Sequence, residues 1–395
     1  MGVYQYQSEE WQALLPWVER RVPVPLGPDS ADLPLLGDRT RGMLLGVALG
    51  DSLGNTSEGL TPAERRRLYG DIVDYLPHPR EDMRHIGFPS DDTQFTFWTV
   101  ESLLRRGHLD PADLAGTFVG PRIFGIGKTV TDFLFAYRFG HKPWYQAGGS
   151  SAGNGALMRI APVILPHLRD MTEGLWRDVV AATIVTHRDE AAVAASTGFV
   201  GLFAECLAWR GIQAPPARWW PETFLRYARP IETPAAGSGA EQSSAGGDSD
   251  SADSPVGVYT SRVPGDSFRG SLCDRVEETV FVAIEEGLSV LDAAERWYSG
   301  AYLLETVPCS LYILARHGAD AEAAVVRAVN DTRDNDTIAA VVGAAVGALH
   351  GRRGLPSRWQ EPLLGRTVED DDGHVQVLIE RAIQAFVTRE GRSVG

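Results

Sequence analysis

Apolar residues along this chain recur at the three- and four-residue spacing of helices, and short apolar strands are hard to find. The longest apolar runs, 191–204 and 338–349, are rich in alanine, valine and glycine. Further helical patterns cover 94–106, 276–287, 290–297, 306–316 and 321–329. The sequence therefore predicts an all-α protein.

Two of these helices carry glycines at every fourth position, which forms a ridge of small residues on one face. Such a ridge lets a second helix approach closely. We expect the two ridges to pack on each other. They consist of Gly42, Gly46 and Gly50, and of Gly343, Gly347 and Gly351.

Two apolar helical runs begin with a cluster of side-chain oxygens. The first cluster is Ser90, Asp91 and Asp92, and the second is Asp334, Asp336 and Thr337. Residues two apart on a helix point away from each other. The two acids of the second cluster can converge only if both lie in the turn before the helix, with the threonine at the first helical position.

Capping alone explains either cluster, because Ser, Thr and Asp cap helix N-termini well. Hard oxygens also suit Mg²⁺, Mn²⁺ or Ca²⁺ rather than zinc. The occurrence of two clusters favours metal binding, since adjacent acids repel unless a cation lies between them. This interpretation requires turns about 240 positions apart to meet in the folded chain.

Several other residues are candidates for the site. Glu58 lies in a polar, glycine-containing turn, after a helix that we expect to end at 51–54; it is a candidate acid or base, or an ordinary exposed glutamate. Gly125 and Gly127 allow either a plain turn or close approach to a ligand. The glycine-rich stretch 148–155 can cradle an anion with backbone amides or act as a connector. His187 is either structural or functional.

Composition narrows the class of protein. The net charge of −15 argues against a nucleic-acid partner held by basic patches. Three widely spaced cysteines predict neither a disulfide framework nor a zinc cluster, and a reducing cytoplasm fits them best. We identify no signal peptide or membrane span, so no membrane partner is expected.

Residues 1–38 are expected to be an N-terminal extension with a short helix followed by a proline-rich path, and 39–387 the main domain. Within it, 233–255 is almost entirely Gly, Ala, Ser, Asp and Pro, which predicts a disordered insertion. Residues 388–395 form a C-terminal tail. Candidate residues lie on both sides of the insertion, so it is not a domain boundary.

Six motifs taken together resemble the ADP-ribosylglycohydrolase family, which includes the enzyme that removes ADP-ribose from dinitrogenase reductase. Their order and approximate spacing match over about 39–351. The motifs are GDSLGNTSE (50–58), SDDT (90–93), GNGALMRIAP (153–162), TH (186–187), ETVP (305–308) and DNDTIAAVVG (334–343).

This resemblance implies one large all-α domain around two Mg²⁺ or Mn²⁺ ions. It implies that Ser90, Asp91, Asp92, Asp334, Asp336 and Thr337 are the metal ligands. Glu58 would be the catalytic acid beside them. Gly125, Gly127, Ser151, Gly153, Asn154 and Gly155 would line the pyrophosphate of ADP-ribose, with His187 near the ligand.

The implied activity is hydrolysis of the glycosidic bond between ADP-ribose and a modified protein, nucleobase or small molecule. Nucleic acid would then matter only as a modified substrate, and no oligomeric state is predicted. The alternatives are a non-catalytic ADP-ribose-binding or toxin-blocking protein, and a hydrolase of another phosphorylated nucleoside or glycoside. Arg333 and Asn335 depart from the family pattern, where glycine and threonine are common, and an arginine at this position could alter access to the metals.

Overall fold

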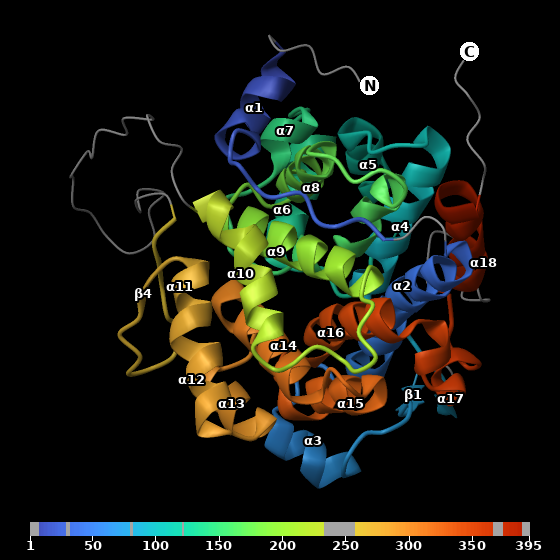
Figure 1. Ribbon diagram of the computed structural model, residues 1–395, viewed down its shortest axis with the longest axis vertical. Coiled ribbons are helices and arrows are strands. Elements are labelled where there is room, and N and C mark those ends of the chain that lie inside the picture. Colours follow the sequence, from blue (N-terminus) through green and yellow to red (C-terminus); the bar gives the residue numbers. More distant parts are fainter. Residues whose placement is uncertain are drawn as a thin grey trace.

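A computed structural model describes residues 8–28, 32–79, 82–120, 122–232, 257–365 and 374–388 (Figure 1). The described chain is mostly helical, which confirms the predicted all-α class. The α-helices are α1 (Glu9–Val18), α2 (Leu33–Asn55), α3 (Pro62–Tyr69), α4 (Asp91–Arg106), α5 (Pro111–Phe118), α6 (Lys128–Arg138), α7 (Trp144–Ala147), α8 (Gly174–Ile184), α9 (Glu190–Leu207), α10 (Trp219–Glu232), α11 (Leu272–Val276), α12 (Val282–Glu286), α13 (Val290–Trp297), α14 (Leu303–His317), α15 (Ala321–Asp331), α16 (Asn335–His350), α17 (Ser357–Gln360) and α18 (His374–Ala382).

Short elements complete the fold. The strands within the described residues are two antiparallel pairs, β1 (Pro77–His78) with β2 (Arg84–His85), and β3 (Tyr259–Thr260) with β4 (Arg269–Gly270). Tight 3₁₀ turns are η2 (Leu157–Arg159), η3 (Ala161–His167) and η5 (Arg352–Gly354), and wide π turns are η4 (Glu277–Phe281) and η6 (Ile383–Thr388).

Helices α2 and α16 lie against each other at the centre of the fold (Figure 1). A Cβ atom added to Gly46 would lie 2.0 Å from the carbonyl oxygen of Gly343, and one added to Gly347 would lie 2.0 Å from that of Gly42. The two backbones therefore touch, and only glycine fits at these positions. The predicted packing of the glycine ridges is confirmed.

Helix α2 is longer than its sequence suggested. It begins at Leu33, so the expected boundary at residue 38 falls inside it, and it continues through Asp51 to Asn55. Packing against α16 explains the continuation, because an added Cβ on Gly54 would lie 2.5 Å from the Cα atom of Asp336. Tertiary contact here overrides the low helix propensity of glycine.

The predicted N-terminal helix is present as α1 and packs on the main body near α7 and α8 (Figure 1). Tyr145 donates a hydrogen bond to Glu9 at 2.6 Å, and the Trp176 indole donates to the Pro23 carbonyl at 3.2 Å. The predicted insertion (233–255) and most of the predicted tail (389–395) lie outside the described residues.

Helix α9 is long and apolar enough to cross a membrane by length and composition. It is, however, 94% buried inside the protein, against α8, α10 and α16. Its apolar composition is therefore that of a core helix.

The close contact between α2 and α16 predicts that one added methyl group at this contact strongly lowers the stability of the fold. Gly46→Ala should destabilise the fold by about 3 kcal/mol, because the new carbon has no room against the α16 backbone. The matched control is Gly116→Ala in α5, where an added Cβ meets nothing within 4 Å; there, alanine should be neutral or stabilising. Chemical unfolding of both variants tests this, and equal stabilities would contradict it.

Candidate metal centre and substrate cavity

The structure brings the two acidic helix starts together. Ser90 is the N-cap of α4 and Asp334 is the N-cap of α16. The Thr337 hydroxyl lies 3.2 Å from a carboxylate oxygen of Asp92, although the two residues are 245 positions apart. The side chains predicted to share cations therefore lie in one place.

Asp336 lies deeper in its helix than expected. We placed both acids of the second cluster before the helix, but α16 begins at Asn335, so Asp336 and Thr337 are in its first turn. Only Asp334 has a non-helical backbone, with φ −84° and ψ 67°. This is sufficient for convergence, because a non-helical N-cap directs its side chain differently from the helical residues that follow.

Asp51 is a member of the cluster that we did not predict. Its carboxylate and those of Asp92 and Asp336 each place an oxygen within 4.8 Å of the others, and all three residues are buried. A signal for it was present in the sequence, since Asp51 directly follows the glycine ridge of α2 and must be buried with it.

Asp51 also holds the start of α4 in place. Its carboxylate accepts hydrogen bonds from the backbone amide of Ser90 at 2.9 Å and from that of Thr93 at 3.0 Å, as well as from the Thr93 hydroxyl. These amides are the ones that a helix N-terminus leaves unpaired. Asp51 thereby fixes the turn that presents Asp91 and Asp92.

Burial and mutual repulsion strongly raise the pKa values of the aspartates in this cluster. Removal from water, followed by the charges of neighbouring carboxylates, raises the pKa of Asp91, Asp92 and Asp334 well above the ordinary value. Burial and Asp336 raise the pKa of Asp51 to about 7. The pKa of Asp336 is raised as well, again chiefly by burial. So many buried acids are disfavoured as anions unless a cation compensates them.

The donor set fits hard divalent cations. Carboxylates and hydroxyls are the ligands that Mg²⁺, Mn²⁺ and Ca²⁺ prefer, and the cluster contains no histidine or cysteine. Among the described residues, Arg65 is a fully buried cation near the cluster, and burial lowers its pKa to about 10, against the opposing charge of Asp336. One guanidinium does not balance this many carboxylates, so the cluster can hold a metal ion.

Arg65 fastens the acidic turn of α16 to the loop that carries Glu58. Its guanidinium donates to the carbonyl oxygens of Leu60, Val329 and Thr332 at 2.7 to 2.9 Å. Asn335 adds a second tie. Its side-chain amide donates to the Gly54 carbonyl at 3.0 Å and to the Ser57 hydroxyl at 3.1 Å. These two contacts give the asparagine, a departure from the family pattern, a structural role.

Asn154 and a left-handed turn position Asp334. The side-chain amide of Asn154 donates to the Asp334 carboxylate at 2.5 Å, and the Asp334 amide donates to the Ser299 carbonyl at 3.0 Å. Tyr298 and Ser299 have φ values of +75° and +52°, a conformation that residues other than glycine rarely adopt. No sequence motif predicts this turn, because neither tyrosine nor serine favours a positive φ.

Glu58 is exposed at the edge of the cluster. The charge of Asp336, together with partial burial and Asp51, raises the pKa of Glu58 to about 7. A carboxyl group with this pKa can both give and take a proton near neutral pH. The structure therefore places a carboxyl group that can exchange a proton beside the acidic cluster.

A cavity of about 240 Å³ connects the acidic cluster to the glycine-rich loops. Most of the predicted site residues line it, whereas Ser90, Asp92 and Ser151 do not. The predicted residues on its wall are Glu58, Asp91, Gly125, Gly127, Gly153, Asn154, Gly155, His187, Asp334, Asp336 and Thr337.

Ser151 supports the glycine loop from behind. Its hydroxyl oxygen accepts hydrogen bonds from the Gly153 amide at 3.2 Å and from the Thr129 hydroxyl at 3.0 Å. Gly125 has a φ of +85°, and an added Cβ would lie 3.1 Å from the Asp91 carboxylate. The loop before α6 therefore approaches the acidic cluster closely because Gly125 has no side chain.

Arg333 is absent from the residues that line the cavity. Its guanidinium lies 4.5 Å above the ring of Tyr298, whose side chain is about half exposed. The cation–π contact draws the side chain toward this ring.

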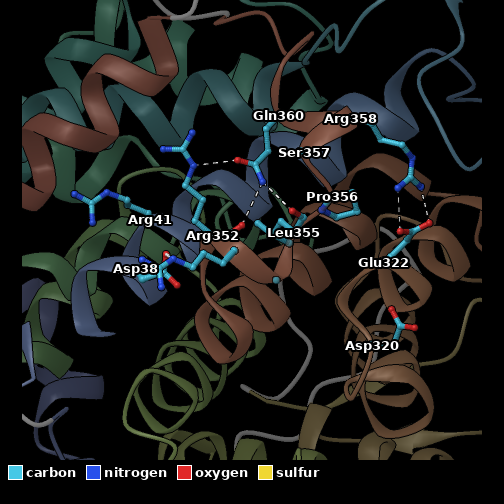
Figure 2. A pocket seen from close by; sticks show the side chains of 12 residues that line it. Asp38, Arg41, Asp320, Glu322, Arg352, Leu355, Pro356, Ser357, Arg358 and Gln360 are labelled. Atoms are coloured by element: carbon cyan, nitrogen blue, oxygen red, sulfur yellow. Dashed lines mark hydrogen bonds and ion pairs between the residues drawn. The ribbon is translucent and has the colours of Figure 1, made fainter. Parts of the chain in front are cut away.

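A larger and more open hollow, of about 900 Å³, lies between the start of α2, η5 and α17 (Figure 2). No predicted site residue lines it. Its arginines have protein partners: Arg358 pairs with Glu322, Arg352 donates to Gln360 at 3.0 Å, and Arg41 pairs with Glu380 at 2.8 Å. The predicted site residues gather at the smaller cavity.

Comparison with known proteins shows the family of this chain. The sequence model of the ADP-ribosylglycohydrolase family matches residues 32–392. A solved structure described as an ADP-ribosylglycohydrolase-related protein complex has a TM-score of 0.57 and 26% identity, covering 89% of this chain and 98% of that one. The chain belongs to the ADP-ribosylglycohydrolase family.

Relatives with printed names include both uncharacterised proteins and hydrolases. YegU of Escherichia coli, described as uncharacterised, is 28% identical over 80% of this chain and 88% of its own. The ADP-ribosylhydrolase ARH3 of Xenopus tropicalis is 24% identical over 85% and 93%. The ADP-ribosyl-[dinitrogen reductase] glycohydrolase of Rhodospirillum rubrum is 29% identical over 46% and 62%.

The raised pKa values predict that the stabilisation of the fold by bound metal depends on pH. The unfolded value for aspartate is 3.8, and in the folded chain burial raises the pKa of Asp51 to about 7. Between these values the folded protein binds more protons, so without metal this cluster makes the fold less stable as pH rises. A divalent ion replaces those protons. Mg²⁺ or Mn²⁺ should therefore raise Tm more at about pH 8 than at about pH 5.

Thermal unfolding with EDTA and with added Mg²⁺ or Mn²⁺ measures this difference at each pH. At each pH, the difference between the Tm with metal and the Tm in EDTA cancels the contribution of other titrating groups, such as His187. Asp336→Asn should remove most of the metal effect. A metal effect of equal size at both pH values would contradict the account.

Proposed function

We propose that this protein hydrolyses the glycosidic bond that joins ADP-ribose to a modified protein, nucleobase or small molecule, and so reverses mono-ADP-ribosylation. One observation carries the proposal: a single cavity has an acidic cluster with Glu58 on one side and a glycine-rich loop with His187 on the other. The family, and the names of two relatives as ADP-ribosyl hydrolases, support the same class of substrate.

The acidic side would hold two divalent cations, Mg²⁺ or Mn²⁺. These ions would supply Lewis-acid polarisation and orient ribose hydroxyls and a water molecule. The residues proposed to hold them are Ser90, Asp91, Asp92, Asp334, Asp336 and Thr337, with Asp51 fixing the α4 turn.

Glu58 would move the proton. As the bond at the anomeric carbon breaks, positive charge develops on the ribose, and a carboxylate at the cavity edge stabilises it. The same group would take a proton from the attacking water and pass it to the leaving atom, which receives the electron pair of the broken bond; a pKa of about 7, raised by Asp336 and burial, suits both transfers.

The glycine-rich side would bind the pyrophosphate. Backbone amides near Gly153 and Gly155 can receive phosphate oxygens, and Gly125, Gly127 and Lys128 line the same cavity. This solution suits a chain with a net charge of −15, whose own field would repel an unneutralised anion.

We place the reaction in the cytoplasm. Cys206, Cys273 and Cys309 are buried free thiols, as expected in a reducing compartment.

Glu58→Gln should lower kcat by at least about 100-fold and leave ADP-ribose binding nearly unchanged, because the amide keeps the size but cannot accept a proton. Release of ADP-ribose from arginine-linked, serine-linked and nucleobase-linked substrates, assayed with Mg²⁺ and with Mn²⁺, is the measurement. Glu295→Gln, an exposed glutamate on α13, is the control and should keep full activity. Full activity of the Glu58 variant would refute its assignment.

Asp334→Ala should abolish turnover and also weaken metal binding, since it removes a proposed ligand that Asn154 orients. Calorimetric titration with Mn²⁺ separates this loss from unfolding. A wild-type protein that binds ADP-ribose but cleaves none of the substrates would instead favour the non-catalytic binder.

A further inference from the structure

His187 forms one wall of the cavity beside the glycine loop. Its side chain is 2% exposed, and its ring edge faces that loop. An added Cβ on Gly155 would lie 2.9 Å from Cε1 and 3.3 Å from Nε2, and one on Gly153 would lie 3.6 Å from Nε2. The Nε2 atom is therefore the ring nitrogen nearest to the amides proposed to receive the pyrophosphate.

The other ring nitrogen is held from behind by Thr186 and Arg159. The Thr186 hydroxyl lies 2.8 Å from Nδ1 of His187, and the Arg159 guanidinium lies 2.8 Å from the same hydroxyl. Both Arg159 and Thr186 are buried. These three side chains form a line that runs from the core to the cavity.

The direction of hydrogen bonding along this line follows from the donors available. Arginine only donates, so the Thr186 oxygen accepts from Arg159. Within the described residues, the other hydrogen-bond partner of the Thr186 hydroxyl is Nδ1 of His187, which can accept the hydroxyl hydrogen only if Nδ1 itself carries no proton. If Nδ1 carried the proton, that hydroxyl hydrogen would be buried without a partner, which costs about 1–3 kcal/mol. The hydroxyl therefore donates to Nδ1, and the proton of the neutral ring is on Nε2.

Arg159 also keeps the ring neutral. Burial, with the nearby charge of Arg159, lowers the pKa of His187 to about 3. Burial lowers the pKa of Arg159 itself to about 9, so the guanidinium stays charged near neutral pH. It is further held by the Ala182 carbonyl at 3.0 Å and by the Phe118 ring at 4.8 Å.

We propose that Arg159 is a positioning residue that, through Thr186, locks His187 as the neutral tautomer whose Nε2–H donates to a pyrophosphate oxygen of the ligand. This rests on the proposed function for the identity of the ligand, but not for the tautomer. The ring donates a directed hydrogen bond and, unlike an imidazolium, carries no charge that would have to be desolvated in the cavity.

The tautomer can be measured directly. Histidine-selective ¹⁵N NMR distinguishes Nε2–H, Nδ1–H and doubly protonated rings, and the spectrum of His187→Gln identifies the signal of His187 among the nine histidines. We expect the Nε2–H form at neutral pH. An Nδ1–H ring or a charged ring in the wild-type protein would overturn the proposal, and this test needs no variant to remain folded except for assignment.

Thr186→Val and Thr186→Ser then test the link to the ligand. Valine keeps the shape and removes the hydroxyl, so the tautomer should become mixed and ADP-ribose should bind about tenfold more weakly. Serine keeps the hydroxyl, so the Thr186→Ser variant should show the Nε2–H tautomer and the wild-type affinity for ADP-ribose. Calorimetry with ADP-ribose in the protein saturated with Mg²⁺ is the readout. Wild-type affinity for the valine variant, whatever its tautomer, would contradict the role in binding.

Failure of the proposed function gives a different result. A wild-type protein that shows the Nε2–H ring but binds no ADP-ribose would contradict the proposal that ADP-ribose is the ligand. The tautomer assignment would still hold.

Discussion

The backbone contact between α2 and α16 determines how the rest of the site is arranged. Glycines on both helices remove the side chains that normally separate two helices, so Gly46 and Gly343 touch through their backbones. The same close approach continues to the end of α2, where Gly54 meets Asp336. As a result, Asp51 near the end of one helix and Asp336 at the start of the other are buried together. The acidic cluster is thus a consequence of helix packing.

This packing creates an electrostatic problem that the protein chain does not solve by itself. Several buried carboxylates repel one another, and burial and repulsion raise the pKa of Asp92 and Asp334 well above the ordinary value. Arg65 is committed to backbone carbonyls at the base of the acidic turn. Shared divalent cations would relieve the repulsion and, at the same time, supply the chemistry that cleavage of a glycosidic bond requires.

Sequence alone identified much of this arrangement, because its signals were strong and local. Helical periodicity predicted the fold class, and glycines four apart predicted the α2–α16 contact. The two acidic helix starts pointed to a meeting across 245 positions, which the contact of Thr337 with Asp92 reproduces. What the sequence did not reveal depends on tertiary packing. Asp51 looked like a helix end, Arg65 was not singled out, and nothing in the Tyr298–Ser299 pair indicates a left-handed turn. The interior position of Asp336 was missed because we required both acids to lie outside the helix.

The most direct test of the central claim is anomalous diffraction from crystals of this protein grown with Mn²⁺. The account predicts manganese peaks within bonding distance of carboxylate oxygens of Asp92 and Asp336, so that the starts of α4 and α16 hold the ions between them. Crystals in which manganese binds elsewhere, or in which the two turns remain metal-free at saturating Mn²⁺, would contradict it.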